Sequence, residues 1–200
     1  DDNGYDVAGA TASGAVTLSS TSTVTQSAVI SGTMLTLLGT GGAFNLGTQN
    51  NNFATLDADT NTLASLSYRD DNGFDVAGAH TSGNTTLSST SPVTQSAAIT
   101  AAGLELLGAG GTFTLNTQNN PITTLAGNTG TVLFQDNSGF SIGTVNTVGL
   151  TASTSVRLTS TGTVSQTPAT VSPTLTLEAA AGTYNLGSNN NDMDLLGANR

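Results

Sequence analysis

The chain has 200 residues, of which 36% are hydrophobic and only 8% are charged, and its formal net charge is −10. Its three basic residues are all arginines, and it has no cysteine. This balance excludes a nucleic-acid or anionic-lipid surface, because both require clustered basic side chains to neutralise phosphates. No stretch is long and apolar enough to predict insertion in a membrane. The chain begins with Asp-Asp and shows no signal peptide, so we expect an interior segment or a mature fragment.

The chain consists of three copies of one repeat, and the first two copies are the most alike. Residues 1–9 read DDNGYDVAG, and residues 70–78 read DDNGFDVAG. We predict a single segment over residues 1–200, made of repeat one at 1–69, repeat two at 70–134 and repeat three at 135–200. The third repeat has gained residues around 141–155. Because insertions confined to one zone of a repeat map to loops, this zone is predicted to carry a loop.

Leucines recur every nineteen residues within each repeat, as at Leu18, Leu37 and Leu56. A period near twenty in a chain rich in Thr, Ser, Gly and Asn predicts stacked coils, and the alternation around each leucine is typical of strands. We therefore predict an all-β parallel β-helix, or β-solenoid, of about nine coils. The predicted core residues are Val16, Leu18, Leu35, Leu37, Leu56, Leu87, Leu104, Leu106, Leu125, Leu158, Leu175, Leu177 and Leu196.

Two features of the coils follow from the same spacing. Val16 and Leu18 are predicted to stack on Leu35 and Leu37, with Leu56 continuing the column. A second, partial column pairs Phe44 with Leu63, and Phe113 with Val132.

The third coil of each repeat is longer than the others. Residues 66–76 place an Asn-Gly between alternating segments, which is typical of a hairpin turn. Two arrangements stay open for this zone: an enlarged coil with a projecting turn or short hairpin, or a fourth, irregular coil.

The Asp-Asp-Asn-Gly-x-Asp segments offer weak candidate Ca²⁺ ligands, because clustered carboxylates suit a hard cation. The candidates are Asp2, Asp6, Asp71 and Asp75. The third copy keeps only Asp136, and the ligand order matches no known calcium loop. We therefore favour turn chemistry and predict no metal and no cofactor.

No catalytic group is predicted. His80 is the single histidine, and its counterpart in repeat one is a threonine, so we expect a surface residue. The Asn runs at 50–52, 119–120 and 189–191 are interpreted as corner residues that tolerate left-handed backbone. The Thr-rich runs do not recur on successive coils, which breaks the regular hydroxyl face of an ice-binding solenoid.

Several motifs resemble the repeats of filamentous-haemagglutinin-type exoproteins, which are large bacterial surface proteins. They are Gly-x-Val-Thr-Leu at 14–18, Thr-Val-Thr-Gln-Ser-Ala at 23–28, Ala-Gly-Leu-Glu-Leu-Leu-Gly at 102–108 and Thr-Leu-Ala-Gly-Asn-Thr-Gly at 124–130. The resemblance implies a right-handed helix, export by two-partner or related secretion, and roles in adhesion and biofilm. It implies no catalytic residue.

From these patterns we expect a structural or adhesive rod, secreted or at the bacterial cell surface, and not an enzyme. The expected partners are neighbouring repeats or identical chains end to end in a filament, and a host or microbial surface ligand. Two alternatives stay open: a saccharide- or ice-binding module, and, less favoured, a polysaccharide-degrading β-helix enzyme. The enzyme would need Asp2, Asp71, Asp136, Arg69 and Arg157 on one coil face.

Overall fold

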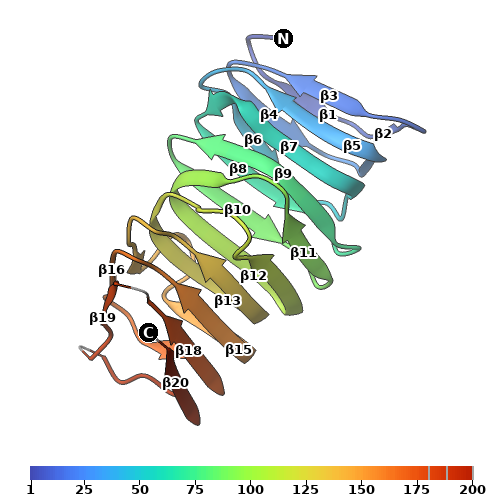
Figure 1. Cartoon of the computed structure of the whole chain (residues 1–200). Helices are drawn as coiled ribbons and strands as arrows, with labels where there is room; N and C mark the ends of the chain where they lie inside the picture. Colours follow the sequence, from blue (N-terminus) through green and yellow to red (C-terminus); the bar gives the residue numbers. More distant parts are fainter. Residues whose placement is uncertain (180, 188, 200) are drawn as a thin grey trace.

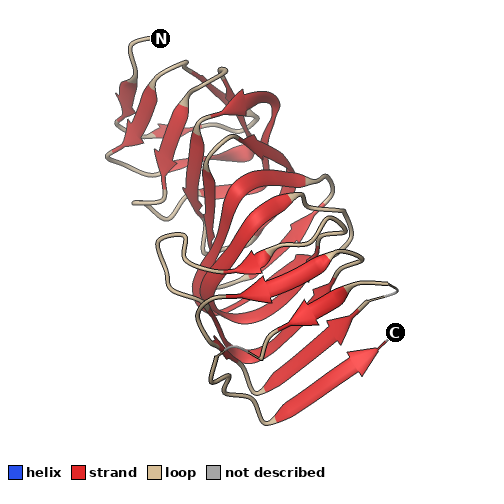
Figure 2. Cartoon of the chain, turned by 90° about the vertical axis from the view of Figure 1, so that its left-hand side faces the viewer, coloured by secondary structure: helices blue, strands red, loops and turns tan. Residues whose placement is uncertain are grey.

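The chain folds as an all-β parallel β-solenoid of about ten turns, which confirms the predicted fold class. The computed structural model describes residues 1–179, 181–187 and 189–199. Strands lie side by side along the axis from the N-terminal to the C-terminal end, as Figure 1 shows. Figure 2, turned by 90°, shows that strands make up nearly all of the coils and that short loops join them. The right-handed winding stays a prediction.

Twenty strands build the solenoid within the described residues. The first repeat contains β1 (Tyr5–Val7), β2 (Ala10–Thr11), β3 (Val16–Ser19), β4 (Thr23–Gln26), β5 (Ile30–Leu38), β6 (Ala43–Leu46), β7 (Asn52–Leu63) and β8 (Ser65–Arg69). The second contains β9 (Phe74–Thr81), β10 (Asn84–Ser88), β11 (Pro92–Gln95), β12 (Ile99–Leu115) and β13 (Ile122–Gln135). The third contains β14 (Ser141–Ile142), β15 (Leu150–Thr159), β16 (Thr163–Gln166), β17 (Thr170–Val171), β18 (Thr174–Glu178), β19 (Thr183–Asn185) and β20 (Leu195–Asn199).

Two long faces run the length of the solenoid, and every strand pairing on them is parallel. Face A begins with β1, β4, β6, β8 and β10, and its inward positions run in register through Tyr5, Val24, Phe44, Leu66, Thr85, Leu104 and Leu125. Face B begins with β3, β5, β7, β9 and β11 and ends with β15, β18 and β20. From β9 onward its inward positions run through Phe74, Val93, Phe113, Val132, Val156, Leu175 and Leu196. Strands β12 and β13 bend round the solenoid and contribute to both faces.

Successive repeats are rotated by half a turn. Tyr5 and Phe74 are equivalent in sequence, but Tyr5 lies on face A and Phe74 on face B. Likewise Leu18 lies on β3 of face B and Leu87 on β10 of face A. A repeat therefore spans about three and a half turns. This is why the chain makes about ten turns and not the predicted nine.

The leucine columns are only partly as predicted. Val16 pairs with Leu35 and Leu18 with Leu37, which confirms the nineteen-residue step. The next step is different, because Leu56 pairs with Leu35, 21 residues away, and not with Leu37. The same 21-residue step joins Leu104 to Leu125 and Leu175 to Leu196. In the second column, the pairing of Phe113 with Val132 is confirmed, whereas Phe44 pairs with Leu66 and not with Leu63.

The hairpin alternative for the long coil is wrong. Strands β8 and β9, on either side of the turn at 70–73, do not pair with each other. β8 pairs with β6 and β10 on face A, whereas β9 pairs with β7 and β11 on face B. The turn is a corner of the solenoid, and the segment after it is the extra half coil.

The core is one apolar cluster that contains most of the predicted core residues. Leu18 is 9% exposed. Nine of the predicted core leucines have no exposed area: Leu35, Leu37, Leu56, Leu87, Leu104, Leu106, Leu125, Leu158 and Leu175. Val16 and Leu177 are partly buried. Leu196 is a correction, because it is 57% exposed on β20, which pairs with β18 and with no other described strand.

Candidate functional site

Each repeat contains a pair of side-chain amides, buried in repeats one and two and partly buried in repeat three, which we call the amide clamp. In repeat two, Gln95 Nε2 donates to Asn120 Oδ1 at 2.7 Å, and Asn120 Nδ2 donates to Gln95 Oε1 at 3.1 Å. Asn120 Oδ1 also accepts a hydrogen bond from Ile99 N at 2.9 Å, and its Nδ2 donates to Leu115 O at 2.8 Å. Repeats one and three hold the same reciprocal pair, as Gln26–Asn51 and Gln166–Asn191.

The clamps correct the interpretation of the Asn runs. Asn51 and Asn120 have no exposed area, and among the described residues only glycines have positive φ angles. The asparagines are therefore not left-handed corner residues. Since the partners are 25 residues apart, each clamp joins one turn to the next inside the solenoid. Its donors and acceptors are satisfied by each other and by the backbone, so the clamp is structural.

The Asp-Asn-Gly corners are held by buried carboxylates. Asp70 has no exposed area, and its Oδ2 accepts hydrogen bonds from Phe53 N at 2.7 Å and Tyr68 Oη at 3.1 Å. Its Oδ1 accepts Asn72 N at 3.0 Å, as the first residue of an Asx turn does. Burial raises the pKa of Asp70, against the hydrogen bonds from Phe53, Asn72 and Tyr68.

The corner at the start of repeat three is built in the same way. Asp136 is fully buried and accepts hydrogen bonds from Ile122 N at 3.1 Å and Ser138 N at 2.7 Å. An edge-to-face aromatic pair flanks each corner: the ring centroids of Phe134 and Phe140 lie 5.2 Å apart, and the pair beside Asp70 is equivalent. These contacts are the turn chemistry that the sequence favours for the segment.

Three of the four candidate calcium ligands accept hydrogen bonds from hydroxyl groups of the next turn. Asp6 accepts hydrogen bonds from Thr25 Oγ1 at 2.9 Å and Ser27 Oγ at 2.5 Å. Asp75 repeats this geometry with the equivalent residues of repeat two. Asp2 accepts one hydrogen bond, from Thr21 Oγ1 at 3.3 Å.

Asp71, the fourth candidate, is paired with the Arg69 guanidinium. Within residues 1–179, 181–187 and 189–199, no three His, Cys, Asp or Glu side chains come together as a metal would require. The carboxylates of Asp2, Asp6 and Asp75 link one turn to the next, whereas that of Asp71 pairs within its own turn.

Glu105 is a buried carboxylate on the outer side of the solenoid. Its side chain is on the outer side of β12 but is only 1% exposed, because the loop over residues 143–149 folds back across it. Thr147 N donates to Glu105 Oε1 at 2.6 Å, and Oε2 accepts hydrogen bonds from Asn146 Nδ2 at 2.8 Å and Thr86 Oγ1 at 2.9 Å. Burial raises the pKa of Glu105, but these donors outweigh it and hold the pKa below its ordinary value of 4.5.

This arrangement belongs to one place in the chain. The loop over 143–149 lies in the predicted insertion and is closed by an antiparallel bridge between Thr144 and Val148. Gly103 makes room for it, because a Cβ there would lie 2.6 Å from Asn84 Oδ1 and 2.9 Å from Val145 Cγ2. The positions equivalent to Gly103 and Glu105 carry larger or uncharged side chains in the other two repeats.

Beside the loop lies an open groove of about 240 Å³ on the outer side of face A. Three adjacent strands and the loop line it, and its side chains are amides and hydroxyls apart from one leucine: Asn45, Ser65, Leu66, Ser67, Asn84, Thr86 and Asn146. Asn45, Ser67 and Thr86 are in register on β6, β8 and β10. We call this the polar groove, and it is the candidate functional site.

We predict that Glu105→Gln loosens the wall of the polar groove. The amide cannot accept all three hydrogen bonds, and bonds to a charged acceptor are worth about 1.5–3 kcal/mol. Amide hydrogen exchange of Thr147 should become about tenfold faster or more, measured by NMR. In the native chain, the stabilisation by Glu105 is present above its unfolded-state pKa and is lost as the pH falls through the lower folded-state pKa. The loop should therefore loosen in acid, below pH 4.5.

Glu178→Gln is the matched control, since Glu178 pairs with Arg157 on the surface. It should leave the exchange of Thr147 unchanged. Equal exchange rates in both variants and in the native chain would contradict the role of Glu105.

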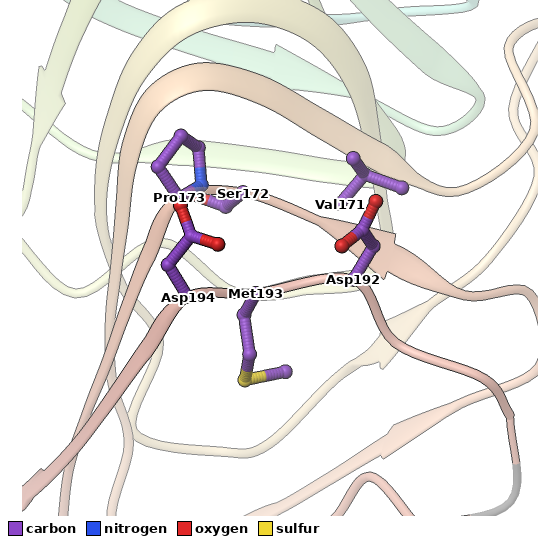
Figure 3. A pocket seen from close by; sticks show the side chains of 6 residues that line it. All are labelled: Val171, Ser172, Pro173, Asp192, Met193 and Asp194. Atoms are coloured by element: carbon purple, nitrogen blue, oxygen red, sulfur yellow. The ribbon is translucent and has the colours of Figure 1, made fainter.

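A second groove, of about 210 Å³, lies near the C-terminal end between residues 171–173 and 192–194. Figure 3 shows the side chains of Asp192 and Asp194 on its two sides, with Met193 between them and pointing away. Both carboxylates are exposed, and an acidic pair at the surface is most often a solvated feature.

The other charged residues do not gather at one site. His80 is half-buried in β9, with Nδ1 3.5 Å from Thr62 Oγ1. Arg157 pairs with Glu178 in the third repeat, whereas Arg69 pairs with Asp71 at the start of the second. Among the described residues, the structure contains no helix long and apolar enough to cross a membrane.

Sequence reasoning missed the polar groove and the clamps. One signal was present for the groove: a charged Glu105 where both other repeats have threonine, together with an insertion in the third repeat. The clamps also left a signal, since Gln and Asn recur 25 residues apart in all three repeats.

The fold and its internal copies define a β-solenoid repeat protein. The chain belongs to a family of repeats of unknown function (DUF5649), whose model matches three consecutive segments at 1–60, 59–129 and 129–196. Comparison with curated proteins and with solved structures gave no match.

Proposed function

We propose that the chain is a structural and adhesive rod of a bacterial surface or extracellular filament protein. One observation carries this proposal: the inward columns continue in register through all three repeats, with the same amide clamp in each. Added repeats of this kind lengthen the solenoid without changing its cross-section.

The charged groups support a role without catalysis. Asp136 is fully buried in a corner, and the arginines at 69 and 157 are each paired with a carboxylate on different turns. A polysaccharide-degrading enzyme would need such groups to converge on one face. The bacterial surface location and the adhesive role rest on the resemblance to filamentous-haemagglutinin-type repeats.

The proposed partners are neighbouring repeats or identical chains end to end. β20 pairs with β18 through one edge, and Leu195 and Leu196 on it are 61% and 57% exposed. A further coil of the same kind would cover Leu196, which continues the inward column of Leu175, and would pair the edge of β20 that no described strand occupies.

Electron microscopy of the protein isolated from its source tests the proposal. We expect unbranched rods of constant width, with a length that grows by about 4.8 Å per turn. A tandem copy of the chain, made as a length standard, should double the length of the single copy. Rounded particles, or short isolated rods without end-to-end continuity, would contradict the filament role.

A further inference from the structure

We infer that the polar groove binds a neutral saccharide. This inference rests on the proposed adhesive function and deepens it, because it names the chemical class of the surface ligand and the residues that recognise it.

The groove offers hydrogen-bonding groups that the protein does not use. In the described part of the chain, the side chains of Asn45, Ser65, Ser67 and Asn84 have no hydrogen-bond partner. Asn146 uses only its Nδ2, which donates to Glu105, so its Oδ1 is free. Amides and hydroxyls together present donors and acceptors side by side, which is what sugar hydroxyls require.

The charge of the groove selects against ionic ligands. No cation lines it, and the chain as a whole carries a charge of −10, so a sulfated or carboxylated ligand would be repelled. Glu105, the nearby anion, is covered by the loop, and both of its oxygens already accept hydrogen bonds. A cationic ligand therefore meets no free carboxylate in the groove.

The backbone selects against a peptide. A peptide that binds by strand addition needs a free sheet edge. β6 is paired on both sides by β4 and β8, and β10 by β8 and β12. The groove also lacks an exposed large apolar side chain as an anchor, since its one leucine, Leu66, is 2% exposed.

The groove is a built feature and not a chance hollow. It lies where the third-repeat insertion packs against face A, and the loop is held there by a buried carboxylate opposite a glycine that leaves space for it. Three strands spaced about 4.8 Å apart give it the reach of a short saccharide segment.

NMR titration of the 200-residue chain tests the inference. The probes are neutral linear hexasaccharides of glucose, mannose and galactose, with a sulfated oligosaccharide and a Gly-Ser peptide for comparison. We expect at least one neutral probe to shift the side-chain amide signals of Asn45, Asn84 and Asn146. Asn45→Ala and Asn84→Ala should each weaken binding by about tenfold, because each removes hydrogen bonds to the sugar.

Asn52→Ala is the matched control, because Asn52 is an exposed strand asparagine outside the groove. It should leave binding unchanged. The inference is overturned if no neutral probe moves the three amide signals, or if the sulfated probe or the peptide binds as tightly as the neutral probes. It is also overturned if Asn45→Ala, Asn84→Ala and Asn52→Ala all bind with the same affinity. Filaments seen by microscopy without saccharide binding would overturn this inference alone, whereas binding by a chain that forms no rods would overturn the filament role alone.

Discussion

Asn120→Ala is expected to lower the free energy of unfolding by about 4 kcal/mol. Asn120 has no exposed area, and its side chain satisfies Gln95, the Ile99 N–H and the Leu115 carbonyl. Alanine leaves these buried groups without partners, at a cost of about 1–3 kcal/mol each. Urea denaturation followed by far-UV circular dichroism measures the loss.

The neighbouring asparagine provides the control. Asn119 is exposed, and its Oδ1 accepts one hydrogen bond, from Asn137 N at 2.6 Å. Asn119→Ala should cost about 1 kcal/mol or less. Gln95→Ala combined with Asn120→Ala should cost less than the sum of the single changes, because both remove the same bonds. Similar small losses for Asn119→Ala and Asn120→Ala would show that the clamp does not stabilise the solenoid.

Gly108→Ala is expected to destabilise the chain by a similar amount, about 4 kcal/mol. Gly108 has a φ of 128°, where a residue with a Cβ is strained by about 1–3 kcal/mol. An added Cβ would also overlap the backbone carbonyl of Ser89 on the preceding turn. Since that carbonyl belongs to the stacked backbone, relief requires the turns to separate, at a further cost of about 1–3 kcal/mol.

Gly14→Ala separates this effect from a general cost of alanine. An added Cβ at Gly14 meets open space, and its φ is not positive. The free energy of unfolding of Gly14→Ala should stay within about 0.5 kcal/mol of that of the native chain. Its urea midpoint should therefore be close to the native one. If Gly108→Ala unfolds at the same urea concentration as Gly14→Ala, the close stacking at this corner is not stabilising.

The half-turn rotation between repeats has a consequence for display. Equivalent residues of neighbouring repeats lie on opposite faces, as Tyr5 and Phe74 do. A feature common to every repeat therefore faces alternate sides of the rod. The polar groove does not alternate in this way, because Glu105, Gly103 and the loop over 143–149 occur once in the chain.

Local spacing was enough to predict the fold class and part of the register. Val16, Leu18, Leu35 and Leu37 stack as their nineteen-residue spacing indicates. The insertion in repeat three was recognisable by length alone. The 21-residue step to Leu56 was not, because a corner absorbs two extra residues without leaving a mark in the hydrophobic pattern.

The candidate site was beyond sequence reasoning for a related reason. Glu105 and Asn146 are 41 residues apart in sequence. Asn45 lies three strands away from Glu105 on face A. Nothing in the chain order shows that these residues meet, because the number of residues per turn varies and small differences accumulate over successive turns.

The sequence by itself determined that this protein is a β-solenoid, since alternation and a period near twenty residues are properties of neighbouring residues and equal coils. Only the tertiary structure decided which coil lies against which. The half-turn rotation, the amide clamps and the polar groove all depend on the sum of corner lengths over several turns. That sum places Gln95 against Asn120, and it brings the loop over 143–149 onto Glu105.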